Sequence, residues 1–199
     1  MEFITSNLPL IAIGICLLFV LSIIIGMRNS IIRQKNQVKR AWADVVAYQL
    51  KKLKVIPLIE DSVRKYTEFE RSVHLQIAEV RSTIKNLQTS AADGVVDVKK
   101  LAAAEQASKN LLAGMNATFE NYPNLRSSEL YNSYFRELSE AQENITAAIA
   151  IFNGAVQYFN NTLEVFPSNL INSIFNHQKP VNEFSDAAAS AEIAYRPNI

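Results

Sequence analysis

The chain has 199 residues, 49% of them hydrophobic, and its 20 Lys and Arg side chains almost balance 19 Asp and Glu, for a formal net charge of +1. A nearly neutral surface has no general field that attracts a nucleic-acid backbone, so we predict no nucleic-acid partner. The single cysteine, Cys16, cannot form a disulfide within the chain. The length suits one membrane anchor and one helical domain.

Residues 8–27 are almost wholly apolar, and twenty helical residues of about 1.5 Å each match a hydrocarbon core of about 30 Å. We therefore predict a transmembrane helix over residues 8–27, preceded by a short extracytoplasmic segment, residues 1–7. A cleaved signal peptide is the alternative. It needs a basic start and a small-residue cleavage site, and neither is present.

Basic side chains follow the span, whereas Glu2 is the one charged side chain before it. The positive-inside rule then predicts that the amino terminus is outside and the helical domain in the cytoplasm. The basic side chains are expected to contact anionic membrane lipid, at about 1 kcal/mol for each one near the surface. Those nearest the span are Arg28, Arg33 and Lys35, and the stretch continues with Lys39, Arg40, Lys51, Lys52 and Lys54.

The helix of the span is expected to continue into the domain, because no Gly or Pro follows Met27 before Pro57. Pro57 predicts a kink or a short break. Apolar residues recur at steps of three, four and seven on both sides of it, which puts Trp42 and Tyr66 in the predicted core.

Residues 89–94 are small and turn-prone, so a second helix is expected to end there. Asp97 is placed to cap a third helix, which Pro123 ends.

The strongest periodicity comes next, where every seventh position from 131 to 166 is a large apolar residue. This repeat predicts a buried, supercoiled helix with Phe152, Phe159 and Phe166 in its core. Gln142 interrupts a second apolar row. Asn153 and Asn160 lie one heptad apart at the margin, where amides can fix the register between helices by hydrogen bonding; a partner-facing role is the alternative.

A short apolar turn follows Pro167, and it either packs on the bundle or touches the membrane. Its apolar residues are Leu170, Ile171, Ile174 and Phe175. The tail, residues 176–199, is polar and alanine-rich, and its last dozen residues are expected to be poorly ordered.

Several of these residues carry a resemblance to the LemA family. The amino-terminal part of the pattern is Asn36, Val38, Ala41, Trp42 and Asp44, then Ile56-Pro57, Val63 and Tyr66. The closing part is Tyr122-Pro123, Phe152-Asn153, Ala155-Val156, Phe159-Asn160 and Phe166-Pro167-Ser168-Asn169. The resemblance implies a bacterial protein with a short amino-terminal membrane anchor, an antiparallel bundle of long helices and no assigned enzymatic activity.

The chain departs from the family pattern at positions that are usually polar or charged. These positions hold Val46, Lys54, Leu58, Gln142 and Ile149. The departures suggest that interior charges have been lost together, since apolar packing can replace a buried ion pair at little cost.

The residues that bear chemistry do not predict an enzyme. The motifs H-E-x-x-H, G-x-S-x-G and G-x-x-x-x-G-K-[ST] are all missing from the sequence. Glu70 stands where the spacing of the second helix demands an apolar residue, and His74 follows four positions later. We interpret Glu70 as a structural, hydrogen-bonded side chain and predict no metal or cofactor; a metal ion held by this pair is the alternative.

The sequence thus predicts an all-α protein, with a helical-bundle domain over residues 28–175 and a tail over residues 176–199. The predicted function is a membrane-anchored scaffold that self-associates as a homo-oligomer and either organises or shapes the bacterial cytoplasmic membrane or displays a partner-binding surface. Two alternatives remain open. One is a monomeric adaptor or sensor that recruits another membrane protein, and the other is an accessory subunit of an enzyme on another chain.

Overall fold

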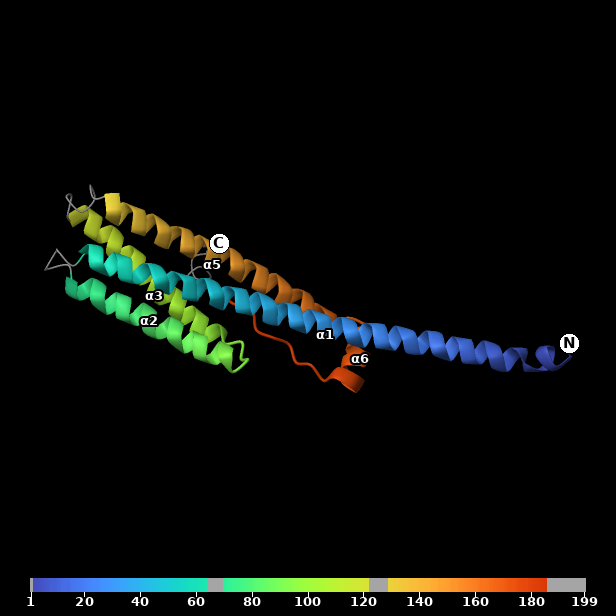
Figure 1. The fold of residues 1–199 in the computed structure, drawn as a ribbon. Coiled ribbons are helices and arrows are strands. Elements are labelled where there is room, and N and C mark those ends of the chain that lie inside the picture. The colour runs from blue at the N-terminus through green and yellow to red at the C-terminus, as the bar shows by residue number, and fades with distance from the viewer. Residues whose placement is uncertain (1, 64–69, 122–128, 186–199) are drawn as a thin grey trace, which may run out of the picture. The chain divides into compact units, whose positions relative to one another are not determined.

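The computed structural model describes residues 2–63, 70–121 and 129–185, and no β-strand occurs among them. The predicted all-α fold with an apolar first helix is confirmed (Figure 1). The helices are α1 (Glu2–Val63), α2 (Glu70–Ala92), α3 (Val98–Asn121), α5 (Glu129–Glu164), the short α6 (Ser168–Ile171) and the π-helix η1 (Asn172–Asn176).

The chain divides into two compact units. Unit 1 comprises Met1–Val38 and Ala155–Val181, and unit 2 comprises Lys39–Gly154 and Asn182–Ile199. Helices α1 and α5 contribute to both units, whereas α2 and α3 belong to unit 2 alone.

Helix α1 runs without interruption through Pro57, so of the two expected outcomes at this proline the short break is wrong, and the kink stays a prediction. Proline removes one backbone hydrogen bond and crowds the preceding turn. Val55 and Ile56 are buried in unit 2, and their packing holds this part of the helix in place.

The first part of α1 is apolar and lies uncovered. An 18-residue window within Leu10–Leu58 reaches a mean hydropathy of 3.0 and is 0% buried. Exposed leucine and isoleucine side chains in such a run are compatible with a membrane anchor.

The turn between α2 and α3 is specified by local hydrogen bonds. The amide of Val95 donates to the carbonyl of Ser90 and that of Gly94 to Ala91, each at 3.0 Å, which closes α2 in a Schellman motif. Gly94 has φ 74°, a left-handed conformation that glycine adopts without a Cβ clash. Asp97 Oδ1 then accepts the amide proton of Lys100 at 3.1 Å, so the predicted cap is present.

The core of unit 2 lies between α1, α2, α3 and α5. An aromatic contact within it joins Trp42 and Phe152, whose ring centroids are 5.2 Å apart at an interplanar angle of 53°. Buried apolar side chains from the four helices complete it: Val45, Ile56, Val73, Ile77, Val80, Ile84, Leu87, Leu101, Leu111, Met115, Leu138 and Ile145.

The heptad repeat of α5 predicts one buried residue too many at its end. Phe159 is buried within unit 1, but Phe166 is 71% exposed and is not part of the core. Helix α5 stops at Glu164, so the backbone turns away before the repeat can bring Phe166 to the buried face. Tyr66 and the last dozen residues, for which we also made predictions, lie outside the described residues.

Candidate functional site

A buried lysine forms the centre of a polar network in unit 2. Lys52 on α1 is 1% exposed, and its Nζ donates to Ser108 Oγ on α3 and to Gln142 Oε1 on α5, each at 2.7 Å. The same Nζ lies 3.7 Å from Glu105 Oε1 on α3, which makes a buried ion pair. One ammonium group therefore links three helices.

The Glu105 carboxylate is held from two sides. Gln49 Nε2 on α1 donates to Oε1 at 2.5 Å, and Gln142 Nε2 on α5 donates to Oε2 at 2.6 Å. A buried charge is costly unless it is paired and hydrogen-bonded, and both requirements are met here.

The electrostatics of Lys52 reflect its surroundings. Burial lowers the pKa of Lys52 from 10.5 to about 8, and the nearby Glu105 carboxylate opposes this shift. A lysine with a lowered pKa can act as a nucleophile when a substrate reaches it. Here the ammonium is almost fully enclosed and its donors face protein acceptors, so the arrangement is suited to holding three helices in register.

The sequence did not reveal this network, although a signal for it was present. Gln49 and Lys52 continue the three-and-four spacing of buried positions between Val45 and Ile56, and this pattern marks polar residues at core positions. The prediction that Lys52 contacts lipid is wrong, because its side chain lies inside the bundle. The buried Lys52–Glu105 ion pair shows that the interior does contain charges, at positions other than the five where the chain departs from the family pattern; the loss of charges at those five stays a prediction.

The other predicted polar and basic residues fall in different places. Arg28 and Arg33 are exposed on α1, and Lys35 is half-buried. His74 is half-buried on α2, while the side chain of Glu70 lies outside the described part of the chain. Within that described part, no group of three or more His, Cys, Asp or Glu side chains is placed to hold a metal ion.

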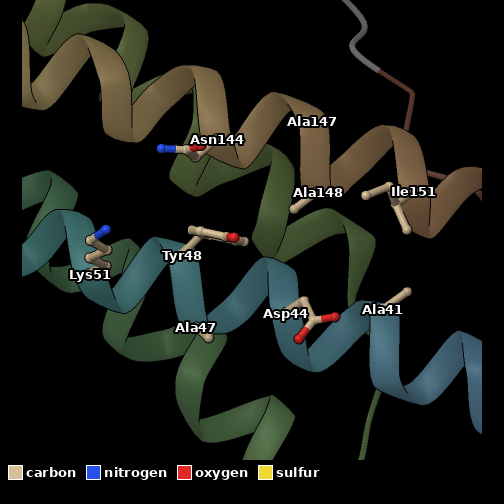
Figure 2. Close-up of a pocket in the computed structure, with 9 residues that line it drawn as sticks. All are labelled: Ala41, Asp44, Ala47, Tyr48, Lys51, Asn144, Ala147, Ala148 and Ile151. Atoms are coloured by element: carbon tan, nitrogen blue, oxygen red, sulfur yellow. The ribbon is translucent and has the colours of Figure 1, made fainter.

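A groove of about 510 Å³ runs between α1 and α5 in unit 2 (Figure 2). In Figure 2, Tyr48 points from α1 toward α5, and Asn144, Ala148 and Ile151 point from α5 toward α1. Four of the nine lining residues are alanines, and Asp44, Tyr48, Lys51 and Asn144 supply the polar groups. Lys51 and Asn144 also line a second hollow of about 330 Å³, together with Lys54, Val55, Leu58, Glu137, Glu140 and Ala141.

Three asparagines bind the backbone that follows η1, and we call these contacts the asparagine clamps. In unit 1, Asn160 Nδ2 donates to the Val181 carbonyl at 2.8 Å, and Asn160 Oδ1 accepts the Val181 amide proton at 2.9 Å. Asn172 makes the same pair of bonds with Gln178, at 3.0 and 2.9 Å.

The same device recurs within unit 2, where Asn153 forms both bonds with Phe184 at 2.8 Å. The clamped residues are therefore every third one, at 178, 181 and 184; each is half-buried, and the residues between them are exposed. A three-residue period is that of an extended, polyproline-like backbone. Asn153 and Asn160 thus pair with an extended segment, whereas we had predicted bonds to another helix.

Comparison with known proteins agrees with the residues that suggested a family. The model of the LemA family matches residues 41–199. Protein LemA of Metamycoplasma hominis is 27% identical over 149 residues, which is 74% of this chain. The aligned region spans 64% of the length of that relative.

Proposed function

Because the chain belongs to the LemA family, we propose that it is a membrane-anchored helical scaffold that associates with copies of itself in the bacterial cytoplasmic membrane. One observation carries the proposal: α1 supplies both an uncovered apolar run and one wall of the groove in unit 2. In this proposal the apolar run of α1 contacts lipid, and the part of α1 that lines the groove contacts a neighbouring copy.

The anchor is argued from exposure and charge. Leu17, Leu18 and Phe19 are each about two-thirds exposed, which is unfavourable in water but suits a hydrocarbon environment. The exposed Arg28 and Arg33 follow the run, so the proposed orientation has the amino terminus outside and the bundle in the cytoplasm.

Self-association is argued from the groove between α1 and α5. Its alanines leave room for the backbone of another helix to approach, and Ile151 beside them is 67% exposed. Anchoring in one plane raises the effective concentration of the bundles, so a weak lateral contact is sufficient for assembly. We propose that a helix of a second copy occupies this groove.

A structural role also fits the buried chemistry. Among the residues that the structure describes, the one strongly perturbed group is Lys52, which is enclosed by hydrogen bonds to Ser108 and Gln142 and lines neither hollow. We therefore propose a protein without enzymatic activity of its own.

The test is the mass of the full-length protein in mild detergent, measured by size-exclusion chromatography with light scattering. We expect an oligomer. Ala147→Arg, which places a charged side chain in the groove, should shift it toward monomer, whereas Ala150→Arg, on an exposed alanine outside the lining of the groove, should not. A monodisperse full-length monomer would refute the scaffold and favour a monomeric adaptor or an accessory subunit.

Orientation is tested separately on intact cells with an impermeant thiol reagent. Single cysteines at Ser6 or Ser127, in a Cys16→Ser background, should be labelled at position 6 and protected at position 127. The reverse pattern would overturn the proposed topology.

A further inference from the structure

The segment that follows α5 presents apolar side chains without a covering element in unit 1. Five large side chains of residues 165–176 are between 47% and 71% exposed. They are Val165, Phe166, Leu170, Ile174 and Phe175. We call this segment the elbow.

The elbow contains no charged residue, and its conformation is stabilised by its own contacts. None of residues 165–176 is Asp, Glu, Lys, Arg or His. Ile171, between the exposed residues, is 8% exposed, so its side chain is packed inside the protein. Asn172 and Gln178 then join the end of the elbow to the following backbone through two hydrogen bonds. Its apolar side chains are therefore displayed by a defined structure.

One hydrogen bond gives the elbow a position along α1. Asn176 Nδ2 donates to the carbonyl oxygen of Arg28 at 3.3 Å, across 148 residues of sequence. Arg28 is the first residue after the apolar run of residues 8–27. The buried face of α1 begins three residues later, at Ile31, which is 0% exposed. The elbow thus meets α1 where the proposed span ends.

The chemistry around this point matches the boundary between lipid headgroups and acyl chains. Arg28 and Arg33 are exposed beside it, and cationic side chains are attracted to anionic headgroups. Short apolar segments next to basic residues lie in that boundary, with the rings and aliphatic groups below the headgroups. Groups of exposed apolar side chains mark sites of contact with another protein or with a membrane.

We propose that the elbow is a second membrane contact, whose apolar side chains insert into the interfacial region of the leaflet that Arg28 meets. This inference rests on the proposed membrane anchor. It adds a lipid-binding surface 138 or more positions away from the span in sequence. The span and the elbow then fix the base of unit 1 at two points, which restrains the rotation of α1 about its own axis.

The experiment uses the full chain, reconstituted into vesicles of phosphatidylcholine and phosphatidylglycerol that contain brominated phosphatidylcholine. Bromine quenches tryptophan fluorescence at short range, and the native Trp42 is buried in unit 2. We expect the emission added by Phe175→Trp to be lost in brominated vesicles, most strongly when bromine is near the headgroup end of the acyl chain. Phe166→Trp is a second probe of the elbow.

The matched control is Ile151→Trp, which places a tryptophan at an exposed apolar position of α5 within unit 2. Its added emission should be retained. If the protein floats with the vesicles but Phe175→Trp and Phe166→Trp are quenched no more than Ile151→Trp, the elbow does not touch lipid and the inference is overturned. The inference is also overturned if the emission of Phe175→Trp and Phe166→Trp changes with protein concentration and not with brominated lipid, because the elbow then contacts another copy of the protein. Failure of the parent protein to float would instead overturn the proposed anchor, and the inference with it.

Discussion

The stability of unit 2 is expected to rise with pH between about pH 8 and pH 10.5 because of Lys52. Its pKa is about 8 in the folded chain against 10.5 for an ordinary lysine. In this window the unfolded chain still holds a proton that the folded chain has released, and stability then increases with pH. A shift of this size corresponds to about 3 kcal/mol. Below pH 8 both states are protonated, and the folded state bears the full cost of the buried ammonium.

Substitution of Lys52 separates this contribution from all other alkaline titrations. Lys52→Met should lower the free energy of unfolding by about 3 to 5 kcal/mol near neutral pH, since it leaves the Glu105 carboxylate buried without its cation. The variant should also lack the rise above pH 8. Lys51→Met removes an exposed lysine one position earlier and should keep that rise.

Urea unfolding in mild detergent, followed by fluorescence, measures these free energies from pH 7 to pH 10.5. Trp42 is the single tryptophan of the chain and packs on Phe152 in the same unit as Lys52, so its emission reports on the relevant core. The difference between parent and Lys52→Met should grow with pH while that between parent and Lys51→Met stays level. Parallel profiles for parent and Lys52→Met would refute the assigned burial of the ammonium.

Three further substitutions test other parts of the fold. Phe152→Ala should lower the free energy of unfolding by about 3 to 5 kcal/mol in urea titrations, because it empties a fully buried ring site; a change below 1 kcal/mol would contradict that packing. Asp97→Ala should lower the melting temperature through loss of a helix cap, which contributes about 1 kcal/mol. Asn160→Ala should speed hydrogen exchange at the Val181 amide, whereas Asn161→Ala, at an exposed neighbour, should leave it unchanged.

The long helices and much of the core were predictable because periodicity reports directly on burial. The spacing around Trp42 and the heptad through Phe152 predicted that both rings are buried, as they are. Asp97, a residue type that caps helices, predicted the start of α3. The pattern failed where a helix ended early. A heptad counts residues but does not reveal that α5 stops at Glu164, so Phe166 was assigned to a face that no longer exists.

The sequence indicated the buried positions of the polar network on α1 but not their partners on the other helices. Gln49 and Lys52 occupy core positions of α1, and this is readable from spacing. Their partner Glu105 lies more than fifty residues away on another helix, and the pairing depends on how α1, α3 and α5 are rotated about their axes. Single-chain periodicity carries no information about that rotation.

The clamps on the residues after η1 have a consequence for how the chain can vary. In unit 1, Asn160 binds both the amide and the carbonyl of Val181, and in unit 2 Asn153 binds the same two groups of Phe184. Each amide side chain therefore recognises the main chain of one residue. Such a clamp makes no hydrogen bond to the side chain of the residue that it holds. It requires only an N–H at the clamped positions, and Pro180, which has none, stands between them. The exposed residues of this stretch can therefore change while its hydrogen bonds to the asparagines are kept, and the constraint falls on the asparagines.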